Sequence, residues 1–227
     1  QQKYGALVWS GDIKSSFPSM KNQVAAGLNM GIAGIPWWTT DIGGFFGANI
    51  NDPEFHELLV RWFEYGCFCP VMRLHGYRWP LQPQYGTTGG ATCVSGAPNE
   101  VWSYTDQVCE ILSDYLRLRE RMLPYITELM EEAHEKGTPV MRPLFYDFPE
   151  DKESWNVETE YMFGPKVLVK PITDADARET DVYLPGGASW TNAWTGETFE
   201  GGQKVHVAAP IEQIPLFTRD GYKLPMK

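Results

Sequence analysis

The sequence has no excess of positive charge and no long apolar run. Lys and Arg together number 19 against 29 Asp and Glu, which gives a formal net charge of −10. An acidic chain without a basic cluster repels phosphate backbones and anionic lipid headgroups. No uncharged apolar stretch reaches the roughly 18 residues that a membrane-spanning helix needs. We therefore expect neither a nucleic-acid partner nor a membrane partner.

Cysteine is also scarce, and its spacing does not suit a metal. The chain has four cysteines, Cys67, Cys69, Cys93 and Cys109. A zinc site would need a second CxxC or HxxxH element, which the sequence lacks. We expect reduced core thiols, no metal and no cofactor. The first residues also lack a charged segment followed by an apolar one, so we expect a cytoplasmic protein, with a secreted protein that has lost its signal as the alternative.

The apolar content is ample for a globular core, and its pattern in the first 140 residues alternates between strand and helix. Hydrophobic residues make up 43% of the chain and aromatic residues 14%. The expected elements are a strand over 6–9, a helix over 19–28, a strand over 31–38, a helix over 52–64 and a strand over 68–74. This β-α-β-α-β order predicts parallel strands joined by right-handed crossovers, in an α/β architecture.

The pattern changes after residue 138. Residues 81–97 are rich in Gly, Thr and Pro and predict an irregular loop, and 100–136 predict one or two long helices interrupted near Leu123-Pro124. Five short strands separated by glycine-rich turns then follow, over 166–171, 179–184, 189–192, 203–208 and 214–218. We therefore expect an α/β part over 1–138 and an antiparallel β-sandwich over 139–227.

Polar side chains follow each of the three expected parallel strands. Asp12 comes after the first strand, Asp41 after the second, and Arg73 and His75 after the third. Each residue alone could be an ordinary turn former, helix cap or structural ion-pair partner. Because parallel strands end on one face, however, these side chains are expected to converge there.

The chemistry of this group favours cleavage of a glycosidic bond. Two carboxylates beside a neutral pocket with Trp9, Trp37, Trp38 and Phe45 are typical of glycosidases, in which one acid protonates the leaving oxygen and another stabilises or attacks the anomeric carbon. No phosphate-binding loop with basic neighbours and no Ser-His-Asp arrangement competes with this interpretation. The alternatives are a carbohydrate-binding or interaction module without catalysis, and a binding protein unrelated to sugars.

The motifs themselves resemble glycoside hydrolase family 31, the α-glucosidases and α-xylosidases. The resemblance rests on Trp9-Ser-Gly-Asp12, on Gly31-x-x-Gly34-x-Pro-x-x-x-x-Asp41-Ile-Gly-Gly-Phe45 and on Glu64-Tyr-Gly-x-x-x-Pro70-x-x-Arg73-x-His75-Gly76. Later runs, including Arg119-x-Arg-Met-Leu-Pro124-Tyr125 and Pro139-x-x-Arg142-Pro143-Leu144, are similar to the helix after that family's barrel and to its proximal C-terminal β-domain. The motifs occur in the family's order over nearly the whole chain.

The resemblance implies a retaining glycosidase and a role for each candidate residue. By that likeness Asp12 is the general acid/base and His75 binds sugar hydroxyls. Arg73 fixes its loop, and Asp41 lines the site and orients a basic neighbour or Asp12. The expected pocket walls are Trp9, Trp38 and Phe45. The implied substrate is an oligosaccharide or other α-glycoside, and the loop from His75 to Pro80 resembles members that act on α-xylosides slightly more than those that act on starch-like glucosides.

One element of the family pattern is missing. The family's nucleophile is an aspartate on an earlier barrel strand, in a Trp-x-Asp-Met-x-Glu-like run, and this sequence has no such run. We therefore expect the last three strand-helix units of a (β/α)8 TIM barrel followed by the antiparallel β-sandwich. The N-terminal portion of the same enzyme would supply the other strands and the nucleophile. The alternative is a non-catalytic carbohydrate-binding or interaction fragment.

Overall fold

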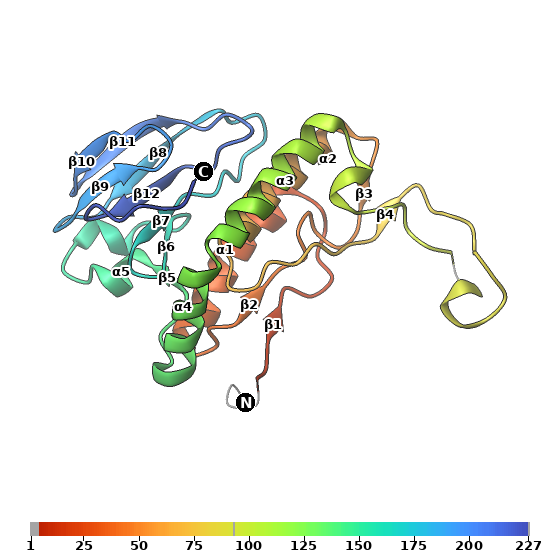
Figure 1. The fold of residues 1–227 in the computed structure, drawn as a ribbon, viewed down its shortest axis with the longest axis horizontal. Coiled ribbons are helices and arrows are strands. Elements are labelled where there is room, and N and C mark those ends of the chain that lie inside the picture. The colour runs from red at the N-terminus through yellow and green to blue at the C-terminus, as the bar shows by residue number, and fades with distance from the viewer. Residues whose placement is uncertain (1–4, 93, 227) are drawn as a thin grey trace.

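The computed structural model describes residues 5–92 and 94–226. Figure 1 shows a part with long helices and short parallel strands beside a part made mainly of antiparallel strands. The elements of the first part are β1 (Val8–Trp9), α1 (Phe17–Ile32), β2 (Trp38–Thr39), β3 (Ala48–Asn49), α2 (Pro53–Cys67), β4 (Arg78–Trp79), α3 (Asp106–Arg121) and α4 (Leu123–Lys136), with short 3-10 turns η2 (Gly89–Thr92) and η3 (Val101–Ser103). The segment around η2 extends away from the body of the molecule, as the yellow ribbon in Figure 1 shows.

The parallel strands differ from the prediction in length and number. The strand predicted over 31–38 is limited to β2, because α1 continues to Ile32. The strand predicted over 68–74 is wrong as drawn, since Phe68 still caps α2 and Pro70 follows closely. The segment still runs beside β2 and the residues after it, with the N–H of Val71 donating to the carbonyl of Trp38 at 3.1 Å and an isolated parallel bridge from Leu74 to Ile42. The structure adds a parallel pair that the sequence did not suggest, β3 with β4.

Local capping explains where the helices of the first part begin and end. A side-chain oxygen of Ser16, Asp52 and Thr105 accepts a backbone N–H in the first turn of α1, α2 and α3 respectively, which satisfies a donor that the helix cannot. The predicted interruption is confirmed, because α3 ends at Arg121 and α4 starts at Leu123. Gly137 ends α4 with a φ of +71°, a conformation that glycine adopts without strain.

The second part is mostly antiparallel sheet, as predicted. Its elements are β5 (Met141–Pro143), α5 (Leu144–Asp147), η4 (Lys152–Trp155), β6 (Tyr161–Phe163), β7 (Val167–Val169), β8 (Glu179–Leu184), β9 (Ser189–Asn192), β10 (Thr198–Glu200), β11 (Gln203–Ala208) and β12 (Leu216–Arg219). Six strands form a sheet in the order β10-β9-β12-β7-β6-β5, and β11 pairs with β8. Val182 and Val205 of the small sheet share a core with Trp190 and Phe217 of the large one.

A second, larger core joins the two parts. It contains buried side chains of α1, α2, α3 and α4 together with Tyr161, Phe163, Val169 and Leu216 of the large sheet. The division near residue 138 therefore stays a prediction from the sequence pattern, because the apolar core is continuous across it.

The cysteines take different positions in this core. Cys67 and Cys69 are buried thiols, and burial raises the pKa of each to about 12. Cys109 is only partly buried, and Cys93 lies outside the described residues. Within the described parts of the chain, no helix is both long and apolar enough to cross a bilayer.

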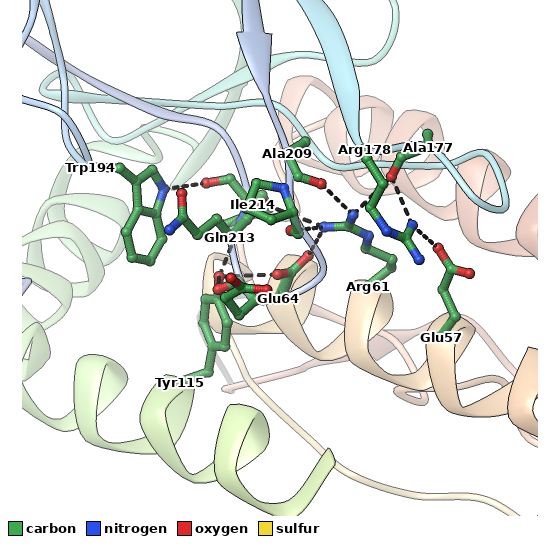
Figure 2. Close-up of polar contacts among 12 residues, drawn as sticks. Glu57, Arg61, Glu64, Tyr115, Ala177, Arg178, Trp194, Ala209, Gln213 and Ile214 are labelled. Atoms are coloured by element: carbon green, nitrogen blue, oxygen red, sulfur yellow. Dashed lines mark hydrogen bonds and ion pairs between the residues drawn. The ribbon is translucent and has the colours of Figure 1, made fainter. Parts of the chain in front are cut away.

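Arg61 of α2 connects the two parts through hydrogen bonds (Figure 2). Its side chain is completely buried. The guanidinium donates to backbone carbonyls of the second part, those of Ala177 at 2.9 Å, Ala209 at 2.6 Å and Pro210 at 3.0 Å. A planar group with five N–H donors suits several carbonyls at once, so one side chain anchors two separate loops of the second part to α2 of the first part.

A buried carboxylate completes this interface. Glu64 Oε2 lies 3.1 Å from Arg61 Nη1, and Glu64 Oε1 lies 3.1 Å from the hydroxyl of Tyr115 on α3. The same hydroxyl accepts the backbone N–H of Ile214 at 3.1 Å, so the network again reaches the second part (Figure 2). Burial raises the pKa of Glu64 to about 8, which the Arg61 guanidinium opposes.

The Arg61 network makes a prediction about stability. Arg61→Met in the complete protein should lower the free energy of unfolding by about 3–5 kcal/mol, since breaking a buried pair leaves the Glu64 carboxylate without its partner. Urea denaturation followed by tryptophan fluorescence measures it. The control is Arg117→Met, because Arg117 and its partner Asp114 are 64% and 67% exposed and exposed pairs contribute little. Equal losses in the two variants would contradict the role given to Arg61.

Candidate active site

Asp12 lies in a tight turn directly after β1. Gly11 has a φ of +73°, which a glycine adopts without strain and which turns the chain out of the strand. The hydroxyl of Ser10 accepts the backbone N–H of Asp41 at 3.3 Å, so the turn after β1 is bonded to the turn after β2. The Asp12 side chain is exposed, which leaves its carboxyl free to meet a ligand.

Asp41 and Arg73 form an ion pair behind this turn. Arg73 Nη2 lies 3.0 Å from Asp41 Oδ1, and the carboxylate has no exposed surface whereas the guanidinium side chain is 36% exposed. The two are in contact without the alignment of a hydrogen bond, and neither Asp41 oxygen has a hydrogen-bond partner among the described residues. Asp41 is therefore a buried charge whose main neighbour is one cation.

The electrostatics of Asp41 show that the predicted residues act on one another. Burial raises the pKa of this carboxyl, and Arg73 and then His75 oppose the shift. The negative charge of Asp12 adds to the raising effect. Only groups close together in a partly dry environment interact in this way. The Asp41–Arg73 ion pair, the contact of the Phe45 and His75 rings and the hydrogen bond from Phe45 N–H to the Ile13 carbonyl bring together the three chain segments that carry Asp12, Asp41, Arg73 and His75.

Phe45 and His75 form a mixed wall beside these charges. Their ring centroids are 5.5 Å apart, with His75 exposed and Phe45 partly buried. The backbone N–H of Phe45 donates to the carbonyl of Ile13 at 2.7 Å, next to Asp12 in sequence. An aromatic face and an imidazole beside a carboxyl can hold a neutral polar ligand such as a sugar.

The two predicted tryptophans differ in position. Trp9 is 48% exposed on β1, so its indole is accessible. Trp38 is 3% exposed, and its indole packs on Gly27 of α1, where an added Cβ would meet Nε1 at 2.7 Å. The structure therefore does not place Trp38 with the other predicted residues. No group of three or more metal-ligating side chains occurs in the described residues.

Arg78 contacts the same loops, and the sequence pattern did not single it out. Its guanidinium is buried, and it donates to the carbonyls of Gly44 at 2.8 Å and Ile42 at 3.1 Å. An arginine two residues after Gly76 in an irregular segment reads as an exposed loop residue. Only the fold shows that it lies beneath the turn between Asp41 and Phe45.

Two family models match nearly the whole chain. Residues 1–129 match the model of the glycosyl hydrolases family 31 TIM-barrel domain, and residues 137–224 match that of the glycosyl hydrolase family 31 C-terminal domain. The chain belongs to glycoside hydrolase family 31.

Particular members of the family are similar over the whole chain. A crystal structure of a family 31 α-xylosidase from a soil metagenome, complexed with xylose, superposes with a TM-score of 0.94 at 53% identity and covers 98% of this chain. An α-xylosidase of Saccharolobus solfataricus is 38% identical over all of it, and α-glucosidase 2 of Bacillus thermoamyloliquefaciens is 35% identical over 97%. The chain spans 33%, 28% and 25% of these relatives, respectively.

Proposed function

We propose that these residues form part of a retaining α-glycoside hydrolase that removes non-reducing terminal α-linked sugars. The observation that carries the proposal is the accessible Asp12 carboxyl beside the Phe45–His75 wall and the buried Asp41–Arg73 pair. Glycosidases need a proton donor next to a neutral, partly aromatic pocket. The relatives named as α-xylosidase and α-glucosidase support the same class.

In this proposal Asp12 is the general acid/base. Asp12 donates its proton to the glycosidic oxygen as the bond to the leaving group breaks, while a carboxylate nucleophile forms a covalent bond to the anomeric carbon. Asp12 then removes a proton from the water that releases the sugar. His75 binds sugar hydroxyls, and Trp9 and Phe45 provide apolar walls.

Asp41 is not a suitable nucleophile in this scheme. A nucleophile must reach the anomeric carbon, yet the Asp41 side chain has no exposed surface and lies against Arg73. We assign it the task of holding Arg73 and, through the Ser10 hydroxyl that its N–H contacts, the turn that carries Asp12. The nucleophile then comes from a portion of the enzyme outside these residues.

The open edges of the parallel strands support that proposal. β1 pairs only with β2 in the described chain, and Met72, in the segment beside β2, makes no backbone hydrogen bond there. An apolar groove of about 600 Å³ adjoins this segment, with Trp102 and Leu116 on its rim 73% and 43% exposed. Unpaired strand edges and exposed apolar side chains are costly in water, and we propose that the remaining strand-helix units of the same barrel cover them.

An assay of the complete enzyme tests the function. We expect hydrolysis of aryl α-xylosides, with aryl α-glucosides as the second substrate, and we expect NMR to show the α-anomer of the sugar as the first product. The matched β-glycosides serve as controls and should not react. A first product of β-configuration would rule out retention. Sugar binding without any hydrolysis would favour the alternative, a carbohydrate-binding fragment.

A further inference from the structure

Arg78 of β4 places a buried positive charge beneath the candidate site. Its side chain has no exposed surface, and it forms no ion pair with a described residue. The guanidinium serves neutral acceptors instead, with Nη2 donating to Ile42 O at 3.1 Å and Nη1 to Gly44 O at 2.8 Å and Phe45 O at 3.4 Å. All three carbonyls belong to the turn between Asp41 and Phe45. A buried guanidinium that donates three hydrogen bonds to a single turn fixes the backbone of that turn.

Glycines allow two loops to approach the guanidinium closely. Gly43 has a φ of +84°, and a Cβ there would lie 2.9 Å from Arg78 Nη2. A Cβ on Gly76 would lie 2.5 Å from Cζ and closer still to Nη1, so the guanidinium would have to move away. Gly76 follows His75 directly. The backbones at Gly43 and Gly76 therefore both pack against the guanidinium of Arg78.

The third loop, which carries Asp12, is tied to the same turn. The carbonyl of Ile13 accepts the N–H of Phe45 at 2.7 Å and that of Phe46 at 3.2 Å. Ser15 N–H in turn donates to Phe46 O at 2.8 Å. A change in the position of Phe45 is thereby passed to the residues that flank Asp12.

We propose that Arg78 is a positioning residue that sets the distances among Asp12, Phe45 and His75 through the backbones of their three loops. The inference rests on the proposed function, because those loops carry the groups of the proposed glycosidase. Arginine suits the task since its planar fork reaches several carbonyls, whereas a lysine ammonium is a single point charge. Arg78 itself has no surface with which to touch a substrate.

The test compares two buried arginines of the complete enzyme. Arg78→Lys should lower kcat for an aryl α-xyloside about 100-fold, the size of effect that a misplacement of about 1 Å produces. It should lower kcat more for poor leaving groups, because proton donation by Asp12 suffers most. Arg61→Lys is the matched control: Arg61 is equally buried and also donates to carbonyls, but those of the sheet domain. It should lower the unfolding midpoint and leave kcat and its leaving-group dependence unchanged.

A milder variant tests the same role if Arg78→Lys does not fold. The side-chain oxygen of Asn99 accepts from Arg78 Nε at 3.2 Å, so Asn99→Ala removes one acceptor and leaves the guanidinium in place. It should show the same leaving-group trend at a smaller size. Unchanged kcat in both Arg78→Lys and Asn99→Ala would overturn the inference, as would a loss in Arg61→Lys equal to that in Arg78→Lys.

A readout without turnover separates this inference from the proposed function. The ring of Phe45 lies near the His75 imidazole, so the ring current of Phe45 changes the chemical shift of the His75 ring protons. The His75 signal is assigned as the one that disappears in His75→Gln. Arg78→Lys should shift that signal and Arg61→Lys should not. If the parent protein is inactive but Arg78→Lys shifts the His75 signal, the proposed function is refuted and the positioning role of Arg78 stands. An active parent with no shift in Arg78→Lys would refute the positioning role alone.

Discussion

Asp12→Asn in the complete enzyme is expected to slow glycosides with poor leaving groups by roughly 10²–10⁴-fold, the usual contribution of a general acid. Asparagine keeps the size of the side chain but has no acidic proton to give. An acidic phenol leaves as its phenolate without being protonated, so cleavage of the corresponding aryl glycoside should be nearly unaffected. Plots of log kcat/KM against leaving-group pKa measure the contrast, and the slope should become steeper in the variant.

The matched control for Asp12→Asn is Asp52→Asn. Asp52 is exposed and caps α2 by accepting the N–H of Glu54. Asparagine serves as well as aspartate at that position, so both the stability and the leaving-group slope should stay as they are. An equal loss for all leaving groups in Asp12→Asn would remove Asp12 from the role of proton donor and leave it a structural or binding role.

The 227 residues by themselves are expected to hydrolyse neither aryl α-xylosides nor aryl α-glucosides. The reason is the proposed half site, in which Asp12 supplies the proton while Asp41 is buried against Arg73 and cannot attack carbon. A retaining mechanism needs two carboxyl groups about 5–5.5 Å apart on either side of the bond. The phenol released over many hours is measured by its absorbance, and the rate is compared with that of the complete enzyme.

The same assay has a built-in control. Turnover by the isolated chain counts against the half-site proposal only if the Asp12→Asn form of that chain lacks it, because a contaminating glycosidase would be present in both preparations. Adding the remaining portion of the enzyme should restore hydrolysis to the intact chain and not to the variant. Restoration would also indicate that the remaining portion associates with this chain.

Much of the candidate site could be predicted because it depends on strand order. Parallel strands end on the same face whatever their lengths, so Asp12, Asp41, Arg73 and His75 converge even though the third predicted strand was wrong. The helices could be predicted for a similar local reason. Ser16, Asp52, Thr105 and Gly137 act on residues at most four positions away.

What could not be predicted depends on contacts between distant segments. The sequence shows Trp38 as one more aromatic residue beside the site, whereas its packing on Gly27 is decided by the direction of a strand side chain relative to a helix. Arg78 and Arg61 look like ordinary charged residues in sequence. Their burial depends on carbonyls that lie 34 and 148 residues away along the chain.

The sequence by itself determined the family, the long helices and the change to an antiparallel sheet, and it singled out the candidate site residues. These follow from short motifs, local capping and hydrophobic spacing, which act over a few residues. The tertiary structure alone decided which carboxyl is accessible and which is buried, since exposure depends on everything packed around a side chain. It also decided that two buried arginines bind the chain together, one beneath the candidate site and one between the barrel part and the sheet, because a guanidinium finds its carbonyl partners only after the distant loops have met.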